Sequence, residues 1–573
     1  MWNDRKVGIL GGGQLGRMMV EAANRLNIQC NVLDAENSPA KQISSHDGHV
    51  TGSFKEREAV RELAKKCDVI TAEIEHVDTY ALEEVASQVQ IEPSWQAIRT
   101  IQNKFNQKEH LAEHGIPMAE HRELAENTPE ELAKAGEQLG YPLMLKSKTM
   151  AYDGRGNYRV NSKDDIADAL EFLKGRPLYA EKWAYFQKEL AVMVIKTKDS
   201  VLSYPTVETV QEDSICKLVY APARNVPDSI NQAAQKLARK AVATFEGKGA
   251  FGVEMFLMND NSLLLCELAS RVHNSGHYTI EGCALSQFET HMRAILDLPI
   301  PPESLQLCQP SIMLNIIGGA APDTHLKAAE AALSIPNASI HLYSKGAAKP
   351  GRKMGHVTVT APTMAEAESH IQPLIDVVDE IRSQRPDIKT KPAPSSCPTK
   401  PTPQVAVMMG SDSDLKTLVP GLKLLRDTFG IEPAVDITSA HRTPTFMAEY
   451  AASAAARGIK VIIAAAGGAA HLPGMAAAHT ALPVIGVPVK GSSLDGVDSL
   501  HSIVQMPRGV PVATVGINNS INAALLAARI IGAFDPAVQR KVEAYAENAR
   551  VENMEVKNTK MQELGWEKYF NQM

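Results

Sequence analysis

Short apolar runs alternate with amphipathic stretches along much of the chain, and this pattern predicts an α/β protein. Near the start, residues 6–10, 29–33 and 69–72 are predicted strands, and residues 15–26 form a predicted helix after a glycine turn. Strands that alternate with helices are typical of a parallel sheet. We therefore predict a Rossmann-like domain over residues 1–100.

The same pattern divides the rest of the chain. Residues 101–300 mix helices with strands such as 142–146, 190–196 and 263–268, and the runs 311–317 and 357–360 indicate a small β-rich domain over 301–382. From residue 405 onward, the strands 405–409, 433–437, 460–466 and 484–489 have helices between them. This last region, 405–573, is predicted to be a doubly wound parallel-sheet domain.

A linker is predicted between these regions. Residues 383–404 read SQRPDIKTKPAPSSCPTKPTPQ, with six prolines and very few apolar side chains. Such a segment cannot bury enough apolar surface to fold by itself. We expect an extended tether between two parts that fold separately.

Composition excludes several classes of protein. The formal net charge is -7 with 22% charged residues, so there is no cationic excess for nucleic acid or an anionic membrane. The seven cysteines include no CxxC pair, which argues against a disulfide framework or a zinc site. Residues 461–489, the most apolar stretch, contain three prolines and two histidines, and the N-terminus does not resemble a signal peptide. A cytoplasmic location is expected.

A glycine-rich loop follows the first predicted strand. GGGQLG at residues 11–16 fits the dinucleotide fingerprint, and Asp34 ends the next strand. The same loop could equally be a tight strand-to-helix turn whose amides hold another phosphate, or no ligand. A nicotinamide-dependent oxidoreductase is therefore an alternative function.

The region after residue 100 carries candidates for a nucleotide site. Lys104 and Lys146, the latter at a strand end, can reach phosphates as point charges, and AYDGRG at 151–156 is a glycine loop with a cation. Glu254 and Glu267 each lie on an apolar strand. A carboxylate on a buried strand needs a partner, and magnesium that bridges ATP phosphates is a natural one.

This ordered set resembles the ATP-grasp superfamily. The segments GGGQLGRM (11–18), AYDGRG (151–156), ELASRVHNSGHYT (267–279) and PGRKMGH (350–356) are similar to those of N5-carboxyaminoimidazole ribonucleotide synthases over about residues 5–380. The resemblance implies a pre-ATP-grasp domain, an ATP-grasp domain and the small β-rich domain. It implies ATP contacts from Lys104, Lys146, Glu181, Lys182, Trp183, Ala184 and Glu189. It implies magnesium ligands at Glu254 and Glu267, and ribonucleotide contacts at Tyr152, Asp153, Arg155, Lys345 and Arg352.

The second half has polar loops at predicted strand ends. Ser411 and Asp414 open a helix, where they could serve as ordinary caps or could bind a phosphate. SAHRTP at 439–444 follows the next strand. The carboxyl ends of strands form the ligand crevice of open α/β sheets, so His441 is a better acid–base candidate there than a lone histidine elsewhere.

GSDSD, SAHRTP, AAGGAAHLPGM and DSLHSIVQMPRGVPV, in this order, resemble N5-carboxyaminoimidazole ribonucleotide mutases, which have a flavodoxin-like fold, over residues 403–565. By this resemblance His441 is the general acid and base, and Ser411, Asp414, Ser439 and Arg442 bind the ribonucleotide. The reaction would need no metal or cofactor, and a homo-octamer is expected.

Together, the halves are similar to the fungal type of fused enzyme that carboxylates aminoimidazole ribonucleotide in purine biosynthesis, using ATP and bicarbonate. The nearest alternative keeps this substrate, but the second half carboxylates C4 directly with carbon dioxide. A nucleotide-binding scaffold without activity is a more distant alternative.

Overall fold

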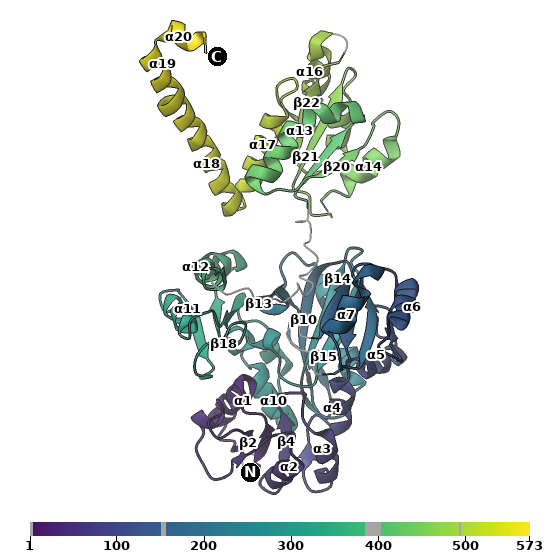
Figure 1. Ribbon diagram of the computed structural model, residues 1–573, viewed down its shortest axis with the longest axis vertical. Coiled ribbons are helices and arrows are strands. Elements are labelled where there is room, and N and C mark those ends of the chain that lie inside the picture. Colours follow the sequence, from purple (N-terminus) through teal and green to yellow (C-terminus); the bar gives the residue numbers. More distant parts are fainter. Residues whose placement is uncertain (1–3, 150–155, 384–402, 456, 492–493, 573) are drawn as a thin grey trace. The chain divides into compact units, whose positions relative to one another are not determined.

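The computed structural model describes residues 4–149, 156–383, 403–455, 457–491 and 494–572. The chain divides into two compact units, Met1–Ser396 and Cys397–Met573 (Figure 1). The division falls inside the proline-rich segment. Three predicted substrate residues, Tyr152, Asp153 and Arg155, and most of the predicted linker lie outside the described residues.

The chain begins with a five-stranded parallel sheet in the order β3-β2-β1-β4-β5. Its strands are β1 (Val7–Leu10), β2 (Cys30–Asp34), β3 (Val50–Thr51), β4 (Val69–Ala72) and β5 (Gln90–Ile91). The helices α1 (Gln14–Arg25), α2 (Arg57–Ala64) and α3 (Thr79–Val85) connect them. The residues of β1 and β4 are buried throughout, as expected for central strands of a parallel sheet.

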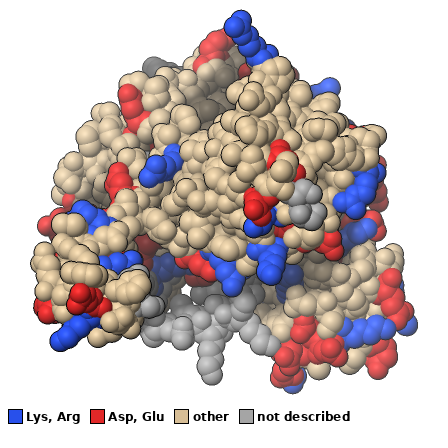
Figure 2. Space-filling model, turned by 90° about the horizontal axis from the view of Figure 1, so that it is seen from above, with Lys and Arg blue, Asp and Glu red and all other residues tan. Residues whose placement is uncertain are grey.

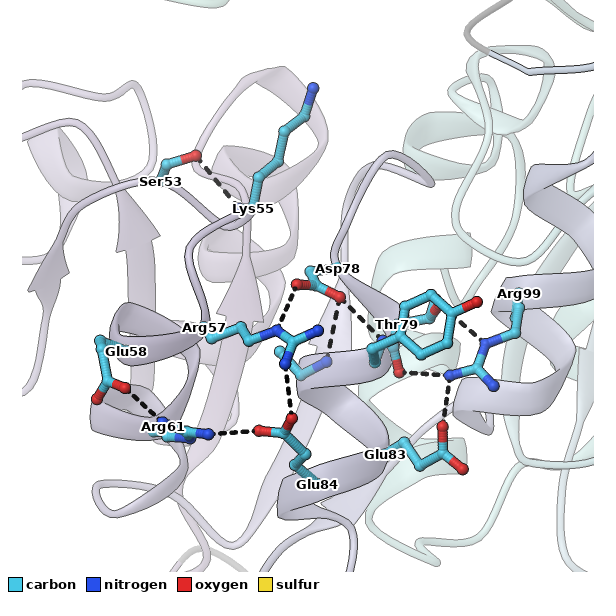
Figure 3. Close-up of polar contacts among 12 residues, drawn as sticks. Ser53, Lys55, Arg57, Glu58, Arg61, Asp78, Thr79, Glu83, Glu84 and Arg99 are labelled. Atoms are coloured by element: carbon cyan, nitrogen blue, oxygen red, sulfur yellow. Dashed lines mark hydrogen bonds and ion pairs between the residues drawn. The ribbon is translucent and has the colours of Figure 1, made fainter. Parts of the chain in front are cut away.

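Ion pairs connect the helices beside this sheet (Figure 3). Arg57 on α2 contacts Glu84 on α3 at 3.0 Å, and Arg61 contacts the same carboxylate at 2.6 Å. On the other side of α3, Arg99 of α4 (Trp95–Gln102) contacts Glu83 at 2.7 Å. The last of these pairs attaches α3 to α4, which ends two residues before Lys104.

Two antiparallel sheets follow. The four-stranded sheet has the order β6-β9-β7-β8 and consists of β6 (His121–Glu123), β7 (Leu143–Ser147), β8 (Asn157–Val160) and β9 (Leu178–Lys182), with α6 (Pro129–Leu139) and α7 (Ile166–Phe172). The second sheet has nine strands in the order β15-β14-β10-β12-β13-β16-β18-β17, and β11 pairs with β10. In chain order, its first six strands are β10 (Phe186–Lys196), β11 (Val201–Ser203), β12 (Val207–Glu212), β13 (Ile215–Ala221), β14 (Gly249–Met258) and β15 (Leu263–Ala269).

The strands of the predicted β-rich segment continue this same sheet. They are β16 (Ser311–Ile317), β17 (Ala338–Leu342) and β18 (Lys353–Thr360), and β16 pairs with β13. One hydrophobic cluster contains Leu218 and Tyr220 of β13 together with Ile312 of β16 and side chains of α12 (Met364–Ser383). A shared sheet and core therefore join this segment to the strands before it. The remaining helices of this unit are α5 (Lys104–Glu113), α8 (Asp228–Ala243), α9 (Thr279–Gly282), α10 (Gln287–Ile295) and α11 (Thr324–Ala332).

The second unit is a doubly wound domain whose five parallel strands have the order β20-β19-β21-β22-β23. The strands are β19 (Val405–Met409), β20 (Ala434–Ile437), β21 (Val461–Gly467), β22 (Val484–Val489) and β23 (Ala513–Thr514). The helices are α13 (Leu415–Lys423), α14 (Pro444–Ala452), α15 (Leu472–Ala478), α16 (Val497–Val504) and α17 (Ser520–Gly532), and after these α18 (Pro536–Val551), α19 (Thr559–Leu564) and α20 (Trp566–Phe570). The strand order is that of flavodoxin-like folds, which confirms the predicted fold class.

Candidate active sites

Carboxylates occupy the glycine loop between β1 and α1. Glu73, directly after β4, accepts hydrogen bonds from the amides of Gly13 and Gly16, the latter at 2.5 Å. Asp34 accepts from the amide of Gly12 at 2.6 Å. Burial raises the pKa of Glu73 above its ordinary value, although both amides oppose this. The amides that would bind a dinucleotide pyrophosphate are therefore already taken, which argues against the nicotinamide interpretation.

Helix α5 places Lys104 at its first position. The side chain of Asn103 caps this helix by accepting hydrogen bonds from two backbone amides. Lys104 Nζ lies 3.5 Å from Glu267 Oε2 and 3.9 Å from Glu75 Oε2. Burial acts to lower the pKa of Lys104, but the two carboxylates outweigh it and raise the pKa. Lys104 is therefore a fixed cation beside one of the predicted magnesium ligands.

Lys146, on β7, and Lys108, which was not predicted as a site residue, share the buried carboxylate of Glu181. Glu181 Oε2 on β9 lies 2.9 Å from Lys146 Nζ and 3.3 Å from Lys108 Nζ. Burial would raise the pKa of Glu181, but the two ammonium groups lower it. The side chain of Glu181 therefore contacts the lysines. The spacing of Lys104 and Lys108, one helical turn apart, is the signal that could have identified Lys108.

The other predicted nucleotide residues follow along β9 and β10. Lys182 contacts Glu120 at 2.7 Å, and the guanidinium of Arg159 lies 4.4 Å from the ring centroid of Trp183. Ala184 is half-buried between the two strands. Burial, with a smaller contribution from the charge of Glu267, raises the pKa of Glu189 on β10 to about 7, although a hydrogen bond with Gln211 opposes the shift.

The predicted magnesium ligands face each other. Glu254 on β14 and Glu267 on β15 are direct cross-strand partners. Burial and the charge of Glu267 raise the pKa of Glu254 to about 8. A divalent cation would relieve this repulsion, so the pair fits the predicted ion. Within the described ranges no group of three or more His, Cys, Asp or Glu side chains is arranged to hold a metal. Magnesium in nucleotide sites is commonly bound by one or two carboxylates together with phosphate oxygens and water.

A histidine lies beside these two carboxylates. His273 Nδ1 is 3.9 Å from Glu254 Oε1. Burial lowers the pKa of His273 to about 3, and the charge of Arg271 adds to the effect. Its imidazole is therefore neutral at physiological pH, and it adds no charge to the pair. Neither His273 nor Arg271 was predicted from the sequence to be a site residue.

Two predicted substrate residues, Lys345 and Arg352, lie in the loop between β17 and β18 and differ in their surroundings. Lys345 Nζ donates to Gln14 Oε1 at 2.6 Å and to the carbonyl of Lys353 at 2.9 Å. It therefore connects the start of α1, beside the glycine loop, to β18. Arg352 precedes β18 and is exposed, so it is available to a ligand.

In the second unit, two of the predicted loops meet at the carboxyl end of β19. Ser411 and Asp414 form a capping box in which the Ser411 amide donates to Asp414 at 3.3 Å. Arg442 donates to the carbonyl of Gly410 at 2.8 Å, and its backbone amide donates to Ser439 Oγ at 3.2 Å. Burial raises the pKa of Asp414, although the amides and Arg442 oppose this.

The predicted acid–base residue has a partner from a third loop. His441 Nε2 lies 2.9 Å from Nδ1 of His471, the residue before α15, and both side chains are exposed. After β19 the chain adds β20 on one side of this strand and then β21 on the other side, so the direction of winding reverses at β19. Ligands of doubly wound sheets bind at the strand ends beside such a switch point. Ser411, Asp414, Ser439, His441 and Arg442 thus lie in the two loops that follow the carboxyl ends of β19 and β20.

Four family models match the chain. They are described as ribonucleotide synthetase preATP-grasp domain (residues 4–102), ATP-grasp domain (109–288), phosphoribosylaminoimidazole carboxylase C-terminal domain (311–370) and AIR carboxylase (404–552). Together they cover both units in the order of the predicted domains. The part of the chain that the structure describes has no helix long and apolar enough to cross a bilayer.

Curated relatives extend over the whole chain. Phosphoribosylaminoimidazole carboxylases of Candida glabrata and Saccharomyces cerevisiae are each 52% identical to it, and each alignment covers 99% of both chains. A crystal structure of carboxyaminoimidazole ribonucleotide synthase from Aspergillus clavatus complexed with ATP is 85% identical, with a TM-score of 0.66, over 67% of this chain and 100% of that chain. The chain therefore belongs to the phosphoribosylaminoimidazole carboxylases, and it is an enzyme of purine biosynthesis that carboxylates 5-aminoimidazole ribonucleotide by way of its N5-carboxylated form.

Proposed function

We propose that the two units catalyse consecutive steps at the sites described above. The first unit transfers the γ-phosphoryl group of ATP to bicarbonate, which gives ADP and carboxyphosphate. The exocyclic amine of aminoimidazole ribonucleotide then captures the carboxyl group and releases phosphate. The second unit moves this carboxylate from N5 to C4. The observation that carries the proposal is the convergence of Lys104, Glu254 and Glu267 in a chain that also pairs His441 with His471 at the strand ends of the second unit.

In the first unit, cations would stabilise the charge that develops on the phosphoryl group. Lys104 and Lys146 are the proposed phosphate contacts, because each ammonium is held by a carboxylate and is only partly buried. Glu189 would accept hydrogen bonds from the ribose hydroxyls. The segment that holds Glu181, Lys182, Trp183 and Ala184 would line the adenine. The proposed ribonucleotide contacts are Tyr152, Asp153, Arg155, Lys345 and Arg352.

Magnesium is the ion that the paired carboxylates fit. Glu254 and Glu267 would hold it between them, and it would neutralise phosphate charge when bound. The raised pKa of Glu254, which burial and Glu267 cause, supports a cation at this position.

In the second unit, His441 would deliver a proton to N5 as the carboxylate leaves as carbon dioxide. After C4 has attacked the carbon dioxide, the same imidazole would take the C4 proton. Ser411, Asp414, Ser439 and Arg442 would hold the ribonucleotide. Arg442 remains charged, so it binds the substrate and does not exchange protons. No metal or cofactor is proposed for this step.

The step of the second unit can be tested against direct carboxylation of C4 by carbon dioxide. The two reactions differ in their substrate. The isolated second unit would be supplied with either the N5-carboxylated ribonucleotide or aminoimidazole ribonucleotide plus carbon dioxide. We expect product only from the first at a useful rate, and the reverse result would establish the alternative.

We also propose a homo-octamer that assembles through the second unit, in the cytoplasm. Exposed apolar side chains on this unit support an assembly: Ile437, Phe446, Leu494, Val504, Phe534, Met554, Trp566 and Phe570. In the face shown in Figure 2, charged side chains of both signs are scattered around a broad uncharged area. Light scattering coupled to size-exclusion chromatography would give the mass, and a monomer would contradict the proposal.

The decisive experiment is an ATPase assay with the purified full-length chain. ADP release should depend on both bicarbonate and aminoimidazole ribonucleotide, and the C4 acid should accumulate in step with ADP. ADP release without dependence on either compound would contradict the proposed first step.

A further inference from the structure

Helix α5 presents a second lysine to the nucleotide site of the first unit. Lys108 lies one helical turn after Lys104, and only 2% of its side chain is exposed. Its Nζ lies 3.3 Å from Glu181 Oε2 and donates to the carbonyl of Cys266 at 3.3 Å. A buried ammonium requires such partners, so Lys108 is the ion-pair partner of Glu181 and is not free to bind a ligand.

Glu181 is also the partner of Lys146, so two lysines share one carboxylate. The side chain of Glu181 is 5% exposed and that of Lys146 is 17% exposed. Of the three side chains, Lys146 alone is open enough to reach a ligand. The three groups together carry one net positive charge, and they would carry none without Lys108.

We propose that Lys108 is a positioning residue for ATP: it neutralises Glu181, so that Lys146 presents an uncompensated positive charge to the phosphates. This inference rests on the proposed contact between Lys146 and ATP. Without Lys108, Glu181 and Lys146 would form a closed neutral pair. A phosphate could then recruit Lys146 only by leaving a buried carboxylate without a full counter-charge, which is costly.

The test measures the binding of a non-hydrolysable ATP analogue to the full-length protein by calorimetry. Lys108→Met and Lys108→Gln should each raise the dissociation constant by about tenfold or more. Glutamine keeps a donor for the Cys266 carbonyl, so it separates loss of charge from loss of that contact. It also keeps the test available if the methionine variant does not fold.

A Glu181→Gln background distinguishes this role from a merely structural one. With the carboxylate gone, Lys108 has no charge to neutralise, so Lys108→Met/Glu181→Gln should bind the analogue within about threefold of Glu181→Gln alone. The control is Lys163→Met, because Lys163 forms an exposed pair with Glu137 at 2.9 Å. This control should bind the analogue as wild type does.

Lys146→Met distinguishes a failure of the proposed phosphate contact of Lys146 from a failure of the proposed role of Lys108. If this variant binds the analogue as tightly as wild type, the proposed phosphate contact is wrong. If Lys146→Met loses affinity while Lys108→Gln binds normally, or while Lys108→Met weakens binding as much in the Glu181→Gln background as in wild type, the role of Lys108 is wrong and the phosphate contact stands.

Discussion

His441 Nε2 and His471 Nδ1 lie 2.9 Å apart, and their rings meet edge to face with centroids separated by 5.1 Å. A hydrogen bond between two imidazole nitrogens needs one donor and one acceptor, so one proton lies between the two rings. The bond joins the loop after β20 to the start of α15. It therefore orients the ring of His441 at the strand ends and leaves its Nδ1 for a substrate.

The role of His441 predicts a specific defect. His441→Asn should keep ribonucleotide binding but lose C4 carboxylation by about 100-fold or more, because asparagine cannot exchange protons near neutral pH. In the full-length variant, ATP should still be consumed, and the carbamate should accumulate and decay to the starting amine. Parallel assays of ADP and of the C4 acid would show this futile hydrolysis.

The matched control is His479→Asn, an exposed histidine after α15. It should retain both activities. Conversion of the carbamate to the C4 acid by His441→Asn at the wild-type rate would contradict the assignment, and His471 would then be the candidate for acid–base catalysis.

Removal of a predicted magnesium ligand should affect the first unit alone. Glu267→Ala should abolish ATP turnover, because it takes away both a carboxylate opposite Glu254 and the partner of Lys104 at 3.5 Å. Mutase activity assayed on the N5-carboxylated ribonucleotide should survive in the same protein. The control is Glu171→Ala, in an exposed pair with Lys174. Wild-type ADP release by Glu267→Ala would disprove the metal assignment.

The two units should work separately. Residues 1–385 and 403–573, expressed apart, should each fold and keep their own reaction, since the chain divides at Ser396 and Cys397 into two compact units. The solved Aspergillus clavatus synthase, which covers 67% of this chain, supports an independent first unit. Assays of each half and of the mixture would test this. A second half that is insoluble or inactive by itself would contradict the linker hypothesis.

Local patterns in the sequence predicted the strands and the order of the polar loops, because apolar periodicity and strand-end motifs depend on neighbouring residues. The pairing of β13 with β16 was not predicted, since it depends on contacts between residues distant in the sequence. That the strands of the predicted β-rich segment continue the central sheet could not be inferred from local patterns.

The polar contacts of Glu73 and Glu181 with residues distant in the sequence were not predicted either. The fingerprint at residues 11–16 gave no sign that Glu73 would bind the loop amides, because Glu73 comes much later in the sequence. Nor did the motif around Glu181 reveal that its carboxylate lies between Lys108 and Lys146. These partners come from different elements, and only the fold brings them together.

The half-buried carboxyl of Glu189 predicts a pH-dependent stability. Its pKa of about 7, which burial causes, lies above the ordinary value of 4.5. Between these values the folded chain holds a proton that the unfolded chain has lost. The contribution of Glu189 to the free energy of unfolding therefore falls as pH rises through this window, by an amount on the order of 3 kcal/mol above pH 7.

Glu189→Gln removes this titration, so the variant should gain stability relative to wild type as pH increases from 5 to 8. Thermal unfolding of the nucleotide-free protein across this range would measure the difference in Tm. The exposed substitution Glu171→Gln should give a difference that stays constant with pH. A constant difference for Glu189→Gln as well would show that Glu189 ionises in the folded protein as it does in the unfolded chain.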